Sequence, residues 1–239
     1  MNIEEFKSIF LEEAQKIQVF VDDDMLNKFY TYMKEIIEWN DKVNVTAITD
    51  EKMFIVKHFI DSLTVNRFVE NKKTLIDIGT GAGFPGVPLK LVNPNLKVKL
   101  IDSVNKKLNV IRDISEKINL SDLEIIHTRA EELATNKEHR EKYDIATTRA
   151  VSNLTTILEY MLPFVKVGGY AICMKGPNYK EELESARNAI EILGGEYQFI
   201  ETLKVHEDLE RNIIVIKKVK ETPKKYPRGQ GKPLKEPIR

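Results

Sequence analysis

The stretch that decides the fold is Leu75-Ile-Asp-Ile-Gly-Thr-Gly-Ala-Gly-Phe-Pro-Gly86. It opens with an apolar run typical of a buried strand, continues into a glycine-rich turn, and places Pro85 at the first turn of an expected helix. Glycines in such a turn let the backbone approach a ligand closely, so that main-chain groups bind it. The stretch therefore predicts a strand, a turn and a helix that bind a nucleoside-type ligand.

Two readings of this glycine loop must be separated. Gly81 to Gly86 matches the G-x-G-x-x-G fingerprint of dinucleotide-binding enzymes, so an NAD-linked oxidoreductase is one alternative. However, Asp77 precedes three alternating glycines, Gly79, Gly81 and Gly83. This D-x-G-x-G-x-G form resembles motif I of class I S-adenosylmethionine-dependent methyltransferases, in which the carboxylate can help anchor the methionine ammonium. We therefore favour a methyltransferase, and NADH binding without S-adenosylmethionine binding would favour the dehydrogenase.

From Lys73 onward, short β-rich runs alternate with helix-length segments, which predicts βαβ units and a parallel sheet. The last two expected strands leave no room for a crossover helix, so we expect them to pair antiparallel. The fold class is α/β: the Rossmann-like fold of class I methyltransferases, with a seven-stranded, mostly parallel sheet. The expected strands are Thr74–Ile78, Lys97–Ile101, Leu123–His127, Tyr143–Thr147, Tyr170–Met174, Tyr197–Leu203 and Ile213–Lys217.

The chain is expected to have three parts. Apolar residues at helical spacing predict a helical extension over residues 1–70, which includes a helix at Glu51–Phe68 with His58 and Asp61 on one face. The catalytic domain is expected over residues 71–220. Residues 221–239 form a basic tail, which we expect to be extended because its prolines disfavour a helix or a central strand. These prolines are Pro223, Pro227, Pro233 and Pro237.

Composition limits the class and the compartment of the protein. Hydrophobic residues make up 42% and charged residues 31% of the 239 residues, which is typical of a globular chain with a real core. The single cysteine, Cys173, excludes an internal disulfide and a multi-cysteine zinc site, and suits the reducing cytoplasm. Neither a signal peptide nor a transmembrane run is visible. With 37 basic and 37 acidic side chains, net charge alone does not indicate a nucleic-acid partner.

Further candidate residues lie where expected strands end. Asp102 follows the glycine loop by about twenty residues, where a carboxylate can accept hydrogen bonds from ribose hydroxyls. The alternative is that Asp102 caps the next helix. Ala130 and Glu131 occupy the place that usually contacts adenine in this fold. Arg149 and Lys175 end the fourth and fifth strands. Either can donate to a base or an RNA phosphate, or be a solvated cation, and Arg149 can instead serve the cofactor.

A set of motifs spread over nearly the whole chain is more specific than the glycine loop. The motifs are Trp39-Asn40, Asn44-Val-Thr-Ala-Ile48, His58-Phe-Ile-Asp-Ser-Leu63, Asp77 to Gly86, Leu100-Ile-Asp-Ser-Val104, Lys106-Lys107, Thr148-Arg149-Ala150, Lys175-Gly176 and Tyr226-Pro-Arg228. With this set, the chain resembles the bacterial 16S ribosomal RNA guanine-N7 methyltransferases, the family once called glucose-inhibited division protein B. Val45, where the family often has leucine, and Lys107, where arginine is common, are mild departures.

The resemblance implies transfer of a methyl group from S-adenosyl-L-methionine to N7 of a guanine in 16S rRNA, on the RNA or on a small-subunit particle. It implies a cytoplasmic enzyme without a metal. The residues that it places at the cofactor are Gly79, Phe84, Asp102, Ser103, Val104, Ala130, Glu131 and Arg149, in addition to Asp77, Gly81 and Gly83 from the glycine loop. Arg149 and Lys175 are the candidates for positioning the substrate.

Guanine N7 carries an in-plane lone pair and no hydrogen, so no general base is expected, and proximity and orientation supply the rate. His58 and Asp61 are interpreted as either an orienting pair or a substrate contact. Trp39 is interpreted as core rather than a base-stacking residue. The tail, with Tyr226 and Arg228, is expected to contact RNA phosphate or to be solvated.

Other function classes stay open from the residues alone. They are a methyltransferase of a protein or small molecule, and an RNA-binding module without activity. Thr147-Thr-Arg-Ala150 replaces the Asn-Pro-Pro-Tyr-type loop that is usual in enzymes that methylate amino nitrogens. This difference argues against amino-nitrogen chemistry.

Overall fold

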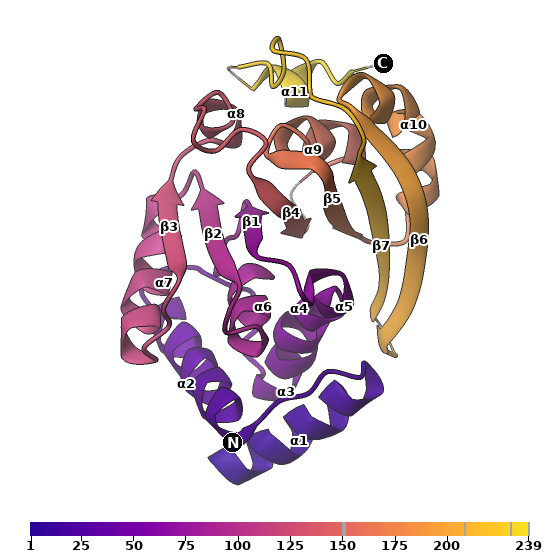
Figure 1. Cartoon of the computed structure of the whole chain (residues 1–239). Helices are drawn as coiled ribbons and strands as arrows, with labels where there is room; N and C mark the ends of the chain where they lie inside the picture. Colours follow the sequence, from indigo (N-terminus) through magenta and orange to yellow (C-terminus); the bar gives the residue numbers. More distant parts are fainter. Residues whose placement is uncertain (150–151, 208, 230, 239) are drawn as a thin grey trace.

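The computed structural model describes residues 1–149, 152–207, 209–229 and 231–238. Its centre is a seven-stranded sheet with the order β3-β2-β1-β4-β5-β7-β6 (Figure 1). The strands are β1 Thr74–Ile78, β2 Lys97–Asp102, β3 Leu123–His127, β4 Tyr143–Arg149, β5 Val165–Lys175, β6 Gly195–His206 and β7 Leu209–Lys218. β1 to β5 pair in parallel, and β7 is antiparallel to both β5 and β6. The predicted fold class and the antiparallel last pair are confirmed.

The last two strands are longer than the sequence indicated. β6 and β7 continue to the hairpin turn through charged positions such as Lys204 and Glu210, which pair with each other. Backbone hydrogen bonds between two strands do not depend on side-chain polarity, so an apolar pattern underestimates a hairpin. β5 likewise begins at Val165, ahead of Tyr170, where the sequence placed its start.

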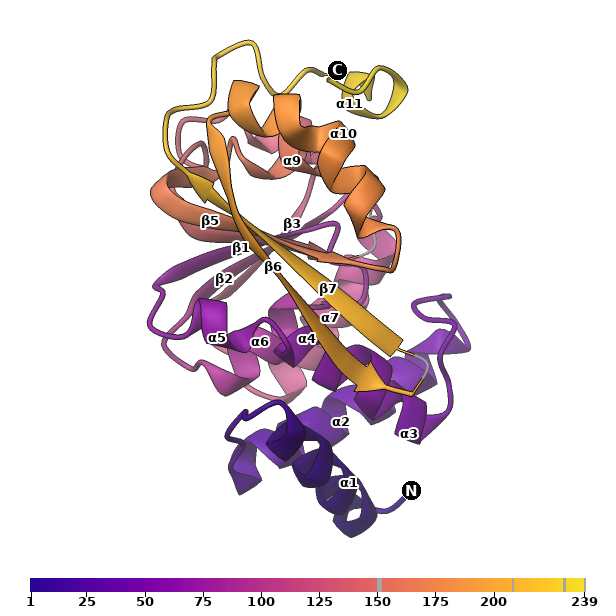
Figure 2. The same ribbon diagram turned by 90° about the vertical axis from the view of Figure 1, so that its right-hand side faces the viewer.

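The two faces of the sheet are covered by different layers, as Figure 2 shows. Alternate strand residues point to opposite faces, so Leu75 belongs to one core and Ile76 to the other. The first face packs against α6 Gly86–Val92 and α7 Asn105–Lys117, and the second against α9 Leu154–Met161 and α10 Tyr179–Ile192. α1 Ile3–Lys16 and α2 Asp23–Asn40 form an outer layer on the first side, where α2 packs on α6 and α7. Among the described residues, no helix combines the length and apolar character needed to cross a membrane.

The segment after α2 differs from the single helix expected at Glu51–Phe68. It consists of α3 Glu51–Phe54, a π-helix η1 at Ile55–Ile60, α4 Asp61–Leu63 and α5 Asn66–Val69. π-helical turns are rare and are often found at functional sites. Here the π-helix carries His58 and leads directly into Asp61.

The tail also differs from the expected extended segment, because it contains the short helix α11 Lys232–Lys235 and packs on the protein (Figure 1). Pro233 lies in the first turn of α11, where a helix does not need its N–H. Arg228 binds the fully buried Glu159 through Nε and Nη2, at 2.9 and 2.7 Å. Tyr226 is buried, so the structure ties both tail residues to the protein.

Candidate active site

The carboxyl ends of β1 to β4 share one edge of the sheet, and the glycine loop opens this edge. The backbone N–H groups of Gly79 and Thr80 donate to the carbonyl of Ile101, which fixes the loop to β2. Gly81 has a φ of 60°, and a Cβ added there would meet no atom within 4 Å. The left-handed backbone therefore faces open space, into which a ligand can fit.

Asp77 lies beneath the loop and is fully buried. Its Oδ2 accepts hydrogen bonds from the Thr80 hydroxyl at 2.6 Å and from the Gly86 N–H at 2.9 Å. Its Oδ1 is buried without a hydrogen-bond partner among the described residues. Burial raises the pKa of Asp77 to about 6, although these two hydrogen bonds and Arg149 oppose the shift. A buried oxygen without a partner is costly, so Oδ1 suits a cationic group of a ligand.

Asp102, at the end of β2, connects two loops. Its Oδ2 accepts from the Gly81 N–H at 2.9 Å, and its Oδ1 accepts from the Val104 N–H at 2.8 Å. The capping alternative is wrong, because Val104 is the N-cap of α7 and no side chain caps that helix. Ser103 is exposed, and Val104 exposes 45% of its surface beside the loop. Asp102 therefore helps to shape the opening.

The turn after β3 lies next to Asp102. The backbone N–H of Thr128 donates to the Asp102 carbonyl at 3.1 Å, and the His127 ring contacts the Ser103 carbonyl at 3.0 Å. α8, at Ala130–Leu133, then begins with a half-buried Ala130 and a buried Glu131. The structure thus brings these two candidates beside the end of β2.

Arg149, at the end of β4, is held on several sides. Its Nη1 donates to the Lys57 carbonyl at 2.8 Å and to Asp61 Oδ2 at 3.0 Å, and its Nη2 bonds His58 Nδ1 at 2.9 Å. The guanidinium carbon lies 5.1 Å from the centroid of the Phe84 ring. With only 13% of its side chain exposed, Arg149 is not the solvated cation of the alternative reading.

His58 is neutral and has a defined tautomer. Its ring stacks on Phe84 with centroids 4.5 Å apart, and its Nε2 lies 2.7 Å from the Thr46 hydroxyl. A guanidinium only donates, so Nδ1 must accept from Arg149 and the proton must lie on Nε2. Burial and the charge of Arg149 lower the pKa of His58 to about 3. This histidine therefore orients Arg149 and does not act as a base.

The motif around Trp39 positions the Thr46 hydroxyl that binds His58. Asn40 Oδ1 accepts from the backbone N–H groups of Val45 and Thr46, each at 2.9 Å. The Thr46 hydroxyl, which accepts the hydrogen bond from His58 Nε2, also accepts from the Ile48 N–H at 3.0 Å. Trp39 is half-buried and packs against the core without being one of its buried members.

Sequence reasoning missed two residues. Arg211 of β7 binds Asp61 through Nε at 2.7 Å and Nη2 at 2.8 Å. A charged residue two positions before the apolar run Ile213–Ile216 was the available signal. The buried Tyr32 of α2 donates its hydroxyl proton to the Ala82 carbonyl at 2.9 Å. It falls on the apolar stripe of its helix, so no sequence signal separated it from ordinary core.

Lys175 has a different environment from the one expected. Its ammonium donates to the Ser152 carbonyl and lies 2.6 Å from a Glu182 carboxylate oxygen. Glu182 also accepts from the Leu154 N–H at 2.7 Å. Only 7% of Lys175 is exposed. It therefore holds the chain that follows β4, and Ala150 of that motif lies outside the described residues.

The comparison with known proteins decides the family. Residues 25–214 match the family described as rRNA small subunit methyltransferase G. The ribosomal RNA small subunit methyltransferase G of Alkaliphilus metalliredigens (strain QYMF) is 45% identical over 98% of this chain and 100% of its own. The enzyme of the same name from Acetivibrio thermocellus is 47% identical over 97% of this chain and 96% of its own. The chain belongs to this family. The dehydrogenase alternative is therefore wrong.

Solved structures of the family's fold class are similar in architecture. M. capricolum TrmK, in complex with S-adenosyl-homocysteine, aligns with a TM-score of 0.53 and 20% identity over 74% of each chain. M. jannaschii TYW2, in complex with AdoMet, aligns with a TM-score of 0.53 and 16% identity over 66% of this chain and 74% of its own. At these identities the likeness concerns the fold alone. In the part of the chain that the structure describes, no group of metal-ligating side chains could hold an ion.

Proposed function

We propose that this member of the methyltransferase G family transfers the methyl group of S-adenosyl-L-methionine to N7 of a guanine in 16S rRNA, in the cytoplasm. The observation that carries this proposal is the family match over residues 25–214, because that range contains every residue of the candidate active site. The geometry of the site supports each part of the chemistry.

The site fits the amino-acid end of the cofactor, which carries one ammonium and one carboxylate. Asp77 and Arg149 are opposite charges close enough to influence each other's pKa. Asp77 Oδ1, which lacks a partner, would accept from the ammonium, and Arg149 would bind the carboxylate. Both would leave the open space beside Gly81 for the centre of the cofactor. When it is bound, S-adenosyl-L-methionine would supply a methyl group carried on a positively charged sulfur.

The nucleoside end would follow the ends of β2 and β3. Asp102 is half-buried and can accept from ribose hydroxyls while it holds the loops. Ser103 and Val104 would flank the ribose, and Ala130 and Glu131 would border the adenine. The remaining proposed contacts are with Gly79, Gly83 and Phe84.

The chemistry needs orientation and no base. Held by Asp77 and Arg149, the cofactor would supply a methyl group to the N7 lone pair, and the electrons of the carbon–sulfur bond would leave with sulfur. Because His58 is locked in its neutral form between Arg149 and Thr46, the site provides a fixed frame for this displacement. Proximity and alignment would then supply most of the rate. Lys175 would position the substrate indirectly, by holding Ser152 through its carbonyl.

The form of the substrate is a finer part of the proposal. The chain has no net charge, so long-range attraction to RNA is limited. We therefore expect recognition to depend on the folded RNA or on an assembling small-subunit particle. Equal rates on short unstructured oligonucleotides would contradict this part.

The test uses methyl-labelled S-adenosylmethionine with small-subunit RNA or particles from cells that lack the gene. Digestion and identification of the labelled nucleoside should give 7-methylguanosine. The Gly81→Val variant should give no label. Label in a different nucleoside would overturn the base assignment, and absence of label with tight cofactor binding would overturn the RNA substrate.

A further inference from the structure

Asp61 is a buried carboxylate shared by two guanidinium groups from strands far apart in the sequence. Arg211 of β7 donates Nε to Oδ1 at 2.7 Å and Nη2 to Oδ2 at 2.8 Å. Arg149 of β4 donates Nη1 to Oδ2 at 3.0 Å. The Asp61 side chain is 1% exposed, and those of both arginines are 13% exposed. The three side chains form one cluster at the edge of the candidate active site.

Arg211 constrains the Asp61 carboxylate more than Arg149 does, because it makes two hydrogen bonds to it and Arg149 makes one. Two parallel N–H bonds from one guanidinium fix both the position and the plane of a carboxylate. Arg149 makes one longer bond to the same group. The orientation of Asp61, and with it the anchor of Arg149, is therefore set from β7.

The other anchors of Arg149 do not replace this contact. Lys57 and His58 both belong to η1, the segment that runs directly into Asp61. Arg211 lies on β7, where it pairs with Leu203 of β6, and β7 pairs with β5 from Asn212 onward. Arg211 thus connects this N-terminal segment to the sheet.

Charge adds a second effect. Two guanidiniums face one carboxylate, and His58 in the same cluster is neutral. The sharing leaves positive charge on Arg149 for an incoming anion. Without Arg211, Asp61 would neutralise Arg149 alone and would compete with the anion.

We propose that Arg211 is a positioning residue that acts through Asp61 to present Arg149 to the cofactor carboxylate. This inference rests on the proposed function, because it takes Arg149 as the group that binds that carboxylate. Arg211 itself need not touch the cofactor.

The test is a double-mutant cycle on the full chain, with S-adenosylmethionine affinity measured by calorimetry. Arg211→Met and Arg149→Met should each raise the Kd about tenfold or more, equal to ~1.4 kcal/mol. If Arg211 acts through Arg149, the double variant should bind no more weakly than Arg149→Met. In Arg211→Met, kcat at saturating cofactor should change much less than the KM for S-adenosylmethionine. Arg211→Lys, which keeps the charge and one bond, should recover part of the affinity.

Arg228→Met is the matched control, because it also leaves a fully buried carboxylate, Glu159, without its guanidinium. It should lower the melting temperature and leave the cofactor Kd unchanged. Wild-type affinity in Arg211→Met and Arg211→Lys, or Kd effects that multiply in the double variant, would overturn the inference. A wild-type protein that binds no S-adenosylmethionine would instead overturn the proposed function.

Discussion

Replacing Tyr32 with phenylalanine removes one oxygen atom from the contact between the N-terminal helices and the glycine loop. The hydroxyl donates to the Ala82 carbonyl at 2.9 Å, and the ring is fully buried against Phe84, with centroids 6.1 Å apart. A Cβ on Gly83 would lie 2.5 Å from the same hydroxyl oxygen. Tyr32 and the loop are therefore closely fitted, and Tyr32→Phe changes this fit without a change in the ring.

The expected cost follows from the carbonyl that loses its partner. Leaving a buried acceptor without a hydrogen bond costs about 1–3 kcal/mol. In a protein of this size, ~2 kcal/mol lowers the melting temperature by about 4–8 °C. Because Ala82 lies between Gly81 and Gly83, a loop that is less well held should also bind S-adenosylmethionine more weakly, by about three- to tenfold.

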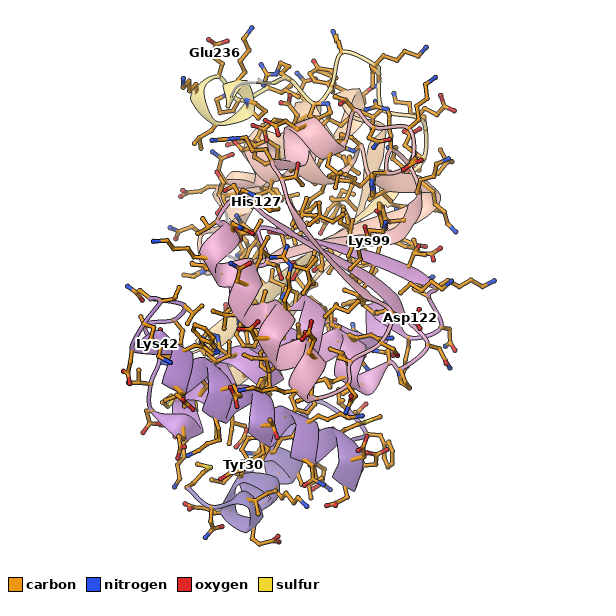
Figure 3. All side chains as sticks on the ribbon, turned by 90° about the vertical axis from the view of Figure 1, so that its left-hand side faces the viewer. Tyr30, Lys42, Lys99, Asp122, His127 and Glu236 are labelled. Atoms are coloured by element: carbon orange, nitrogen blue, oxygen red, sulfur yellow. The ribbon has the colours of Figure 1, made fainter. Side chains whose placement is uncertain are left out.

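Thermal unfolding and calorimetric titration of the cofactor measure both effects. Tyr30→Phe is the matched control on the same helix, because the Tyr30 hydroxyl donates to the Met1 carbonyl at 3.3 Å and does not touch the loop. Figure 3 shows Tyr30 among the N-terminal helices, away from His127 at the end of β3. The control should keep the wild-type cofactor affinity. If Tyr32→Phe has wild-type stability and affinity, the hydroxyl does not hold the loop.

Three further predictions concern the cofactor site. The pKa of Asp77 is raised to about 6, so lowering the pH from 7 to 5 should protonate its carboxylate and weaken S-adenosylmethionine binding, approaching about tenfold per pH unit; titrations across this range should show no such trend in Asp77→Asn, and a trend there would refute the role. Asp102→Ala frees the N–H groups of Gly81 and Val104 and should raise the cofactor Kd about 10- to 100-fold, since hydrogen bonds to a charged group contribute about 1.5–3 kcal/mol; Asp102→Asn, which keeps one acceptor, should bind better than the alanine variant. Gly81→Val places a branched side chain at a φ of 60° and in the open space beside the loop. The left-handed backbone costs about 1–2 kcal/mol of folding free energy, so the variant should still fold. Filter binding of labelled cofactor to the folded variant should detect no bound cofactor.

The sequence predicted the architecture well because the signals for it are local. Hydrophobic periodicity and the glycine loop indicated β1 at Thr74–Ile78 and β3 at Leu123–His127, with the bounds that the structure has. The short connection before β7 settled its antiparallel direction, since a parallel return needs a longer crossover. The strands were underestimated where charged residues continue a hairpin whose stability comes from backbone pairing.

The residues of the site were found as a set of motifs, but their partners were not. Asn40, Thr46, His58 and Arg149 were visible as separate motifs, and the structure joins them into one line of hydrogen bonds. Lys175 carried the same sequence signal as Arg149, yet it binds Glu182 and Ser152. Two cations at neighbouring strand ends thus serve different purposes, which residue type and position did not distinguish.

The sequence by itself determined the fold class, the glycine loop and the family, because each depends on residue types at fixed spacing along the chain. Only the tertiary structure decided that Arg211 shares Asp61 with Arg149, that Tyr32 holds Ala82, and that the tail packs through Arg228. Asp61 and Arg211 are 150 positions apart, and a contact over such a separation leaves no periodic signal. Burial and the directions of donors and acceptors are properties of the folded chain, and they decide which charges pair and which stay available to a ligand.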